Sequence, residues 1–316
     1  MSNKWRFFWV ASFALVVFFQ ACGMHSWEEL LISTADEKKM GREFDSLVRI
    51  GHKDVMTANE KLFSPSTPAQ QELYDFYQAR GKEMVKSIDP KDMDALMTNE
   101  RLCRNNLSNK NEALACTQDN FFEFNIIESN QLNAFAVPGG YVYFYTQILK
   151  PAKGFQSESE LMSVMGHEIG HVVLHHSRDR MVKAAGATAV IQIFLGDGIA
   201  GLIGLLGAQF WLASNSQSDE SQSDSMGFYY TNKMGISSEG LSDFFNRGLI
   251  KKEDGTCDKA ANASVGDVFS THPPSCERVH ANNTRISNFH QNFPKDLHTS
   301  PITNKKFTDL VTAAGI

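Results

Sequence analysis

The stretch Leu161–His176, LMSVMGHEIGHVVLHH, contains the motif HExxH within an apolar run. In an α-helix, residues four positions apart lie on the same face, one turn above the other. The imidazoles of His167 and His171 can therefore bind a single zinc ion. Glu168 follows the first of them, where its carboxylate can act as a general base on a water molecule whose pKa zinc lowers to about 7. The pattern predicts a helix over residues 158–179 that carries a hydrolytic metal site.

A third protein ligand distinguishes the classes of HExxH enzyme. Leu174 and Ser177 occupy the positions where the pattern HExxHxxGxxH needs Gly and His, so that class is excluded. Further along the chain, Glu220 and Asp224 form an ExxxD pair that would share one face of a helix. Glu220 would complete a His₂Glu site, and Asp224 would accept the outer N–H of a ligand histidine. Taken alone, the pair fits a solvated acidic helix face better, but beside HExxH it favours the metal site.

Four blocks of the sequence resemble the HtpX/CAAX-prenyl-protease family of zinc metallopeptidases, in particular its soluble, exported members. They are NAFAVPGGYVYFY, HEIGHVVLHHS, ESQSDSMG and FSTHPPSCERV, in the family's order between residues 133 and 279. The resemblance implies an α+β, mostly helical fold of zincin type, with a small sheet whose edge strand flanks the active site. It also implies one zinc ion per chain, bound by His167, His171 and Glu220, with Glu168 as the base.

Three further residues of these blocks are candidates for the cleft. Asn133 and Ala134 begin a predicted hairpin whose edge strand could pair with an extended substrate through main-chain hydrogen bonds. The alternative is a hairpin that serves folding only. His272 lies where the family motif places a histidine near the cleft, as a displaceable fourth ligand or a donor to the developing oxyanion. A histidine on a surface loop is the alternative.

Three more polar residues lie close to the motifs in sequence. Arg278 could pair with a carboxylate near the cleft, although a structural ion pair is the stronger interpretation. His175 and His176 follow the motif helix. For them a role behind the ligands or in the core is favoured over direct metal binding.

The amino-terminal segment is typical of an exported protein. Lys4 and Arg6 precede the apolar run Phe7–Phe19, which would span about 20 Å as a helix, too short for a bilayer core of about 30 Å. The following Gln-Ala-Cys22 resembles a bacterial lipobox, so we expect a lipid on Cys22 and a periplasm-facing place in the cell envelope. Gly23 after the cysteine favours the outer over the inner membrane. An ordinary signal peptide is the alternative.

The chain has five cysteines, and acylation of Cys22 would leave four. Each remaining pair is close in sequence, so Cys103–Cys116 and Cys257–Cys276 are the predicted disulfides in an oxidising compartment. Four free buried thiols, or another of the three connectivities, are the alternatives.

Composition excludes several other classes of protein. The 316 residues are 42% hydrophobic and carry a net charge of −6 without a basic block. A disordered chain, a multi-span membrane protein and a nucleic-acid-binding protein are therefore not expected. The predicted organisation is a signal segment at 1–22, a helical segment at 23–64, the metallopeptidase domain at 65–290 and a tail at 291–316.

Local patterns predict the main helices and strands of the chain and leave two interpretations for one apolar segment. Helices are expected over 28–51 and from Pro68 to about Ile88, a strand over 121–127 and a hairpin over 133–145. The apolar stretch 184–213 is expected to form buried or membrane-facing helices beside the cleft, with a re-entrant membrane hairpin as the alternative.

Together these features predict a lipid-anchored zinc endopeptidase. By analogy with the family, its substrates would be misfolded or misassembled envelope proteins, and envelope-assembly machinery is a possible partner. The alternative is a chaperone-like assembly factor whose zinc site orders a binding surface and rarely cleaves. The complete HExxH and ExxxD motifs favour the enzyme, because a binding protein does not need Glu168.

Overall fold

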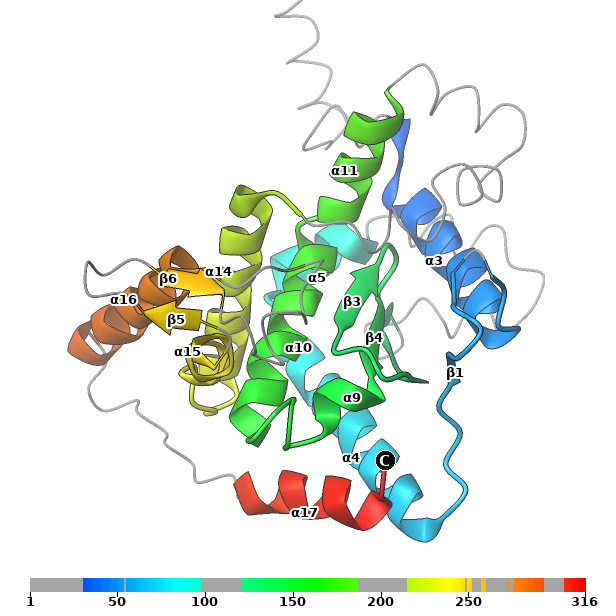
Figure 1. The fold of residues 1–316 in the computed structure, drawn as a ribbon. Helices are drawn as coiled ribbons and strands as arrows, with labels where there is room; N and C mark the ends of the chain where they lie inside the picture. Colours follow the sequence, from blue (N-terminus) through cyan, green and yellow to red (C-terminus); the bar gives the residue numbers. More distant parts are fainter. Residues whose placement is uncertain are drawn as a thin grey trace, which may run out of the picture.

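A four-stranded sheet and one long helix, α10 (Glu158–Val173), lie at the centre of the molecule (Figure 1). The computed structural model describes residues 31–53, 55–97, 121–186, 215–247, 249–251, 257–259, 272, 275–292 and 304–316. Within these residues, no helix is both long and apolar enough to cross a membrane. Most of the apolar stretch expected at 184–213 lies outside the described residues, as do Cys22, Cys103 and Cys116.

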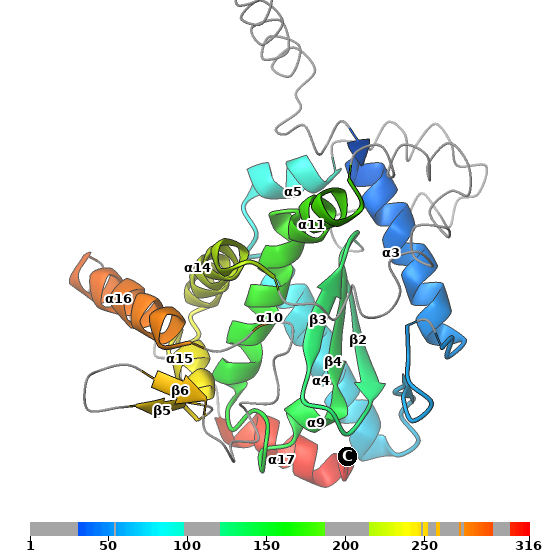
Figure 2. The same cartoon turned by 45° about the horizontal axis from the view of Figure 1, so that its top comes forward.

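The sheet has the strand order β1-β2-β4-β3, in which the predicted hairpin forms one edge. Its strands are β1 (Lys61–Leu62), β2 (Glu123–Glu128), β3 (Ala134–Val137) and β4 (Tyr141–Tyr145). The long connection between β2 and β4 makes that pair parallel, whereas the other two pairs are antiparallel. β4 is buried along its whole length, and β3 packs beside α10 (Figures 1 and 2).

Helices cover both faces of the sheet. On one face, Phe135 and Tyr143 pack against Phe44 of α3 (Thr34–Arg49), with ring centroids 6.0–6.1 Å apart. On the other face, Phe144 packs against α4 (Pro68–Val85) and α10 within the larger hydrophobic core. The alternation of side chains along the strands sends each to one of these two cores.

The remaining helices extend this framework around α10. α14 (Gln217–Lys233) packs along α10, and α17 (Asn304–Ala314) packs across α4. The other elements are α5 (Pro90–Met97), α9 (Thr146–Leu149), α11 (His176–Ala185), α15 (Gly240–Asn246), α16 (Cys276–Asn292), β5 (Leu249–Lys251) and β6 (Cys257–Lys259). The expected α+β, mostly helical architecture is confirmed. The division of the chain at residues 22, 64 and 290 stays a prediction.

Two helix boundaries differ from those predicted. The single helix expected over 158–179 is two helices, because His175 adopts the left-handed conformation, with φ 56°, between α10 and α11. A residue with this φ cannot continue a right-handed helix. α3 begins at Thr34, later than expected, because Ser33 caps it through a reciprocal pair of hydrogen bonds with Asp36.

A buried lysine ties α3 to the sheet. The ammonium of Lys38 donates hydrogen bonds of 2.6 Å to the carbonyl oxygens of Phe121 and Gly139, at the start of β2 and in the hairpin turn. It also lies 4.8 Å from the ring centroid of Tyr141. Burial lowers the pKa of Lys38 to about 8, and the carboxylate of Glu123 opposes this shift only in part.

This shift predicts how stability depends on pH. Between pH 8 and 10.5 the unfolded chain keeps a proton on Lys38 that the folded chain has released, so this residue's contribution to stability rises with pH. In Lys38→Met we expect the gain in free energy of unfolding between pH 7.5 and 10.5 to be smaller by about 3 kcal/mol. Urea denaturation at the two pH values measures it. The exposed neighbour gives the control Lys39→Met, and equal gains in both variants would contradict the prediction.

Candidate metal centre

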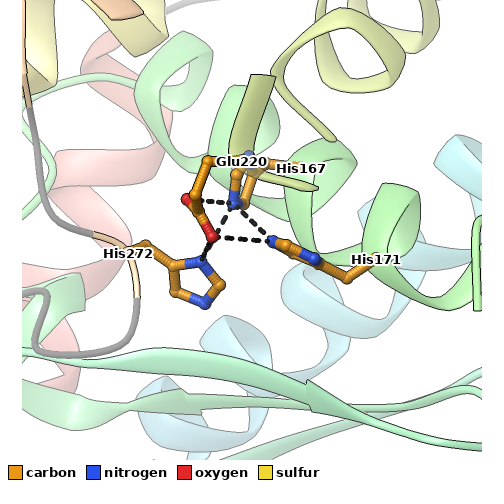
Figure 3. A group of neighbouring side chains, drawn as sticks. All are labelled: His167, His171, Glu220 and His272. Atoms are coloured by element: carbon orange, nitrogen blue, oxygen red, sulfur yellow. Dashed lines mark hydrogen bonds and ion pairs between the residues drawn. The ribbon is translucent and has the colours of Figure 1, made fainter. Parts of the chain in front are cut away.

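Four buried side chains from three parts of the chain converge beside the sheet (Figure 3). His167 and His171 come from α10, Glu220 from α14 and His272 from the segment before α16. Each is between 2% and 4% exposed, and one potential ligand atom from each lies within 4.8 Å of all the others. These residues form the group that we call the metal cluster.

The separations between the donor atoms of the metal cluster fit a tetrahedral zinc site. His167 Nε2 lies 3.0 Å from His171 Nε2 and 3.1 Å from His272 Nδ1. Glu220 Oε1 lies 2.9 Å from His272 Nδ1 and 3.3 Å from His171 Nε2. A tetrahedron with metal–ligand distances of about 2.0–2.1 Å has edges of about 3.3 Å. Four of the six separations among the donors are therefore close to those between the ligands of one zinc ion.

Glycines let the two ligand-bearing helices approach closely. A Cβ atom on Gly166 would lie 3.0 Å from the Cα of Gly227, and one on Gly170 would lie 3.1 Å from the Cα of Ser223. Any larger side chain at these positions would push α14 away from α10. The close contact brings Glu220, near the start of α14, over the two histidines of α10. The glycines on either side of the motif are thus part of the reason that the site forms.

The outer nitrogen of His167 faces a buried carboxylate. Its Nδ1 atom lies 2.8 Å from Oδ1 of Asp224, which is fully buried, so the alternative of a solvated acidic face is excluded. Arg278 binds both oxygens of Asp224, at 2.6 and 2.8 Å, and lies 2.8 Å from Oε2 of Glu220. Burial opposes ionisation of Asp224, but Arg278 outweighs it and holds the pKa of that carboxyl well below its usual range. Asp224 thus lies behind a candidate ligand, and its role there stays a prediction.

The two histidines after the motif helix point in different directions. His176 places its Nδ1 atom 2.8 Å from the outer nitrogen of His171, and its other nitrogen faces Gln222. His175 turns away from the site and pairs with Glu37 of α3 at 2.6 Å. His176 therefore lies behind a candidate ligand. The left-handed backbone at His175 directs its side chain toward α3 instead.

The charges of the buried site favour a divalent cation. Three carboxylates, those of Glu168, Glu220 and Asp224, face one guanidinium, that of Arg278, which leaves a formal excess of two negative charges. Burial opposes protonation of His167, but Asp224 and Glu220 outweigh it and raise the pKa of His167 to about 9. A cation would take the place of this proton and neutralise the excess.

Burial has the opposite effect on the second histidine of the motif. It lowers the pKa of His171 well below its usual value, which keeps the imidazole in the neutral form that binds metals. The donor types, their spacing and the charge balance all fit zinc.

Glu168 lies at the centre of this arrangement without a hydrogen bond. It is fully buried, and neither carboxylate oxygen has a hydrogen-bonding partner among the described residues. Its Oε1 atom lies 3.4 Å from Nε2 of His272. A buried carboxylate without a donor is unfavourable unless water or a ligand satisfies it. At the position predicted for the general base, the carboxylate is therefore free to accept a hydrogen bond from a water molecule or a substrate.

The structure also places the candidates for substrate contact. Ala134 begins β3, the edge strand, and pairs with Phe144 of β4, while the carbonyl of Asn133 accepts a hydrogen bond from the backbone N–H of Tyr145. Both candidates are buried, with exposed fractions of 4% for Asn133 and 0% for Ala134. β3 is the edge of the sheet beside the motif helix, as expected. The role of the two residues in binding substrate stays a prediction.

Other predicted and unpredicted residues complete the description. Cys276, at the start of α16, is disulfide-bonded. Its predicted pairing with Cys257, which begins β6, stays a prediction. Sequence reasoning missed Asn215, the residue before the α14 cap, which contacts His171 and His272. It also missed Arg180 of α11, which donates a hydrogen bond to Asn215. Neither belongs to a motif, so no local signal could have identified them.

Comparison with known proteins agrees with this geometry. A model described as Peptidase family M48 matches residues 100–286. The metalloproteases LoiP and YcaL of Escherichia coli (strain K12) are 29% and 28% identical over 170 and 178 residues, which is 52% of this chain in each case. The beta-barrel assembly-enhancing protease of Yersinia pestis is 30% identical over 155 residues, or 45% of this chain.

These matches cover part of each protein. The aligned region spans 62% of the length of both Escherichia coli proteins and 31% of that of the Yersinia protein. The family match itself covers more than half of this chain and contains the whole metal cluster. The family resemblance drawn from four sequence blocks is thereby confirmed, whereas the exported, lipid-anchored type stays a prediction. The chain belongs to peptidase family M48.

Proposed function

We propose that the protein is a zinc-dependent endopeptidase of the bacterial cell envelope. One observation carries this proposal: a buried carboxylate without a hydrogen bond, Glu168, lies against a cluster of three histidines and one glutamate spaced as zinc ligands. The ligand geometry alone would suit a structural zinc site. A structural site does not need a buried carboxylate without a hydrogen bond beside it, whereas hydrolysis needs a base there.

The residues of the site can divide the reaction among them. His167, His171 and Glu220 would hold the zinc ion, with His272 close enough to act as a fourth ligand. The chemistry that zinc supplies when bound is polarisation of a carbonyl oxygen and a lower pKa for a water molecule. Glu168 takes a proton from the attacking water and passes it to the nitrogen of the leaving amine.

Two neighbours hold the ligands in the orientation that this chemistry needs. The carboxylate of Asp224, 2.8 Å from the outer nitrogen of His167, would favour the tautomer that leaves Nε2 free for the metal. Arg278 in turn holds Asp224 and the outer oxygen of Glu220 in place.

The edge strand offers a place for the substrate. A peptide that adds to β3 in an extended conformation would lie beside α10, with its backbone groups hydrogen-bonded to the strand. Asn133 and Ala134 at the start of β3 are the proposed contacts. Recognition through the main chain suits an enzyme that cleaves unfolded segments, because it depends little on the substrate's side chains.

The cellular role is proposed from the amino-terminal sequence and from the relatives. The lipobox-like Cys22 supports a lipid anchor that faces the periplasm, with the outer membrane favoured over the inner. Matched relatives are named metalloproteases, and one is named a beta-barrel assembly-enhancing protease. We infer that the substrates are misfolded or misassembled envelope proteins, and that envelope-assembly machinery is a partner.

Metal removal tests the proposed activity directly. The purified protein should contain about one zinc ion per chain by elemental analysis and should cleave an unfolded protein such as reduced casein. A chelator should abolish cleavage, and zinc added in small excess over the chelator should restore it. Gel electrophoresis of the substrate measures the cleavage. If the zinc-loaded protein leaves every unfolded substrate intact, the proposal is wrong and the chaperone-like alternative is favoured.

A further inference from the structure

The side-chain amide of Asn215 lies at the edge of the metal cluster. Its Nδ2 atom is 3.5 Å from Nε2 of His171 and 3.5 Å from Nδ1 of His272. Asn215 is only partly buried, whereas the four candidate ligands are almost fully buried. Asn215 therefore joins the almost fully buried cluster to a less buried part of the site.

Arg180 fixes which end of this amide points into the site. Its Nη1 atom donates a hydrogen bond of 3.1 Å to Oδ1 of Asn215. A guanidinium can only donate, so the amide oxygen must face Arg180 and the NH₂ group must face the cluster. The usual ambiguity between the two ends of an asparagine side chain is removed by this contact.

If a metal is bound, the nitrogens next to this NH₂ group can no longer accept hydrogen bonds from it. The nitrogens that it faces, His171 Nε2 and His272 Nδ1, belong to the group of potential ligand atoms. A nitrogen that binds a metal has no lone pair left to accept a hydrogen bond. In the loaded protein, the two amide hydrogens would face the reaction site and need another acceptor. The carbonyl oxygen of a peptide bond bound for cleavage would supply such an acceptor.

We propose that Asn215 is a catalytic residue that donates a hydrogen bond to the scissile carbonyl oxygen as it becomes an oxyanion. Arg180 is the positioning residue that keeps the amide in the donating orientation. As water adds to the carbonyl carbon, the carbonyl π electrons move to oxygen, and the hydrogen bond from Nδ2 strengthens with that charge. This inference rests on the proposed peptidase function.

An amide suits this task better than the neighbouring histidine. His272 has its Nδ1 atom 2.9 Å from Glu220 and 3.1 Å from His167, so that nitrogen is engaged within the cluster. An asparagine amide does not titrate near neutral pH, and its N–H groups are donors under all conditions in which the enzyme would work. Asn215 would therefore supply an oxyanion donor that does not depend on the protonation of a histidine.

The test compares Asn215→Leu with the wild type and with Gln217→Ala, an exposed position at the start of α14. Leucine has a similar shape but cannot donate a hydrogen bond. We expect kcat to fall about 10²–10³-fold with KM within about threefold of the wild type, as for the loss of an oxyanion donor. Zinc content and thermal stability should stay at their wild-type values.

Two inhibitors provide a readout that does not depend on turnover. A peptide phosphonate carries a tetrahedral anionic oxygen at the position of the oxyanion, whereas a peptide thiol would bind zinc through sulfur and has no such oxygen. In Asn215→Leu the affinity for the phosphonate should fall by about the same factor as kcat/KM, and the affinity for the thiol should not change. Calorimetry measures both affinities. An equal loss for the two inhibitors would show that Asn215 supports the metal or the cleft in general, and would overturn the proposal.

A double-mutant cycle tests the role of Arg180. Arg180→Met keeps much of the apolar side chain but removes the donor that orients the amide, so we expect a loss in kcat of about tenfold. Combined with Asn215→Leu, it should cause no further loss, because Arg180 acts through Asn215. Additive losses would refute the positioning role.

The outcomes also separate this inference from the proposed function. If the wild type cleaves unfolded protein and Asn215→Leu cleaves at the same rate, only the inference is wrong. If the zinc-loaded wild type neither cleaves nor binds the phosphonate, both are wrong.

Discussion

Glu168→Gln should lower kcat for peptide hydrolysis by about 10²–10⁴-fold while the protein keeps one zinc ion per chain. Glutamine fills the same space next to His167 and preserves the fully buried packing, but it cannot take a proton from water. The carboxylate has no hydrogen-bonding partner among the described residues, so its replacement breaks no structural hydrogen bond there. The folded state should therefore be as stable as the wild type, or more so, and the loss should be confined to the chemical step.

Initial rates on a fluorogenic unfolded substrate, together with elemental analysis, measure this effect. The matched control is Glu277→Gln, an exposed carboxylate at the start of α16, which should leave kcat and zinc content unchanged. The same variant distinguishes the peptidase from the chaperone-like alternative in cells. If Glu168→Gln keeps full function in the envelope with zinc bound, proteolysis is not the role of this protein. If it loses function and traps uncleaved envelope proteins, the trapped chains identify the substrates.

Glu220→Ala should reduce zinc from one ion per chain to less than about a tenth at micromolar free zinc. The substitution removes one ligand and also leaves Arg278 with Asp224 as its acidic partner in the site. The remaining three histidines would carry no ligand charge to balance the metal, which weakens binding further. Hydrolysis should fall to the background level, because the activated water and the polarised carbonyl are lost together.

Elemental analysis after dialysis against buffered zinc gives the stoichiometry. Thermal unfolding with and without zinc gives a second measure, since only a folded state that binds the ion is stabilised by it. Zinc should raise the unfolding temperature of the wild type and of the control Glu239→Gln, an exposed carboxylate at the start of α15, but not that of Glu220→Ala. Stoichiometric zinc in Glu220→Ala would remove Glu220 from the ligand set.

Features that depend on neighbouring residues in the chain were predictable. The spacing of His167 and His171 puts both on one face of α10, and Pro68 marks the first residue of α4. The Pro-Gly-Gly turn of the hairpin forms because Gly139 and Gly140 adopt positive φ values of 79° and 88°, which a glycine accepts without strain. In each case the determining interaction lies within a few residues, so a sequence pattern can express it.

Features that depend on distant residues were predictable only in part. The spacing of Glu220 and Asp224 predicts one shared helix face, but nothing in that spacing excludes a solvated face. Burial decides between the two possibilities, and burial follows from the close packing of Gly166 against Gly227. The break at His175 was missed for a similar reason, because its side chain pairs with Glu37, 138 residues away in sequence.

The sequence by itself determined the local features of this protein: two histidines and a candidate base on one helix, a carboxylate pair on another, and a hairpin with two glycines in its turn. Only the tertiary structure decided which groups meet in the metal cluster. It brought His272 to the other three residues of the metal cluster, placed Arg278 against Asp224, and turned the amide of Asn215 toward the cluster through Arg180. Helix and turn patterns arise from local backbone geometry, whereas the assembly of a site depends on side-chain packing between segments far apart in the chain.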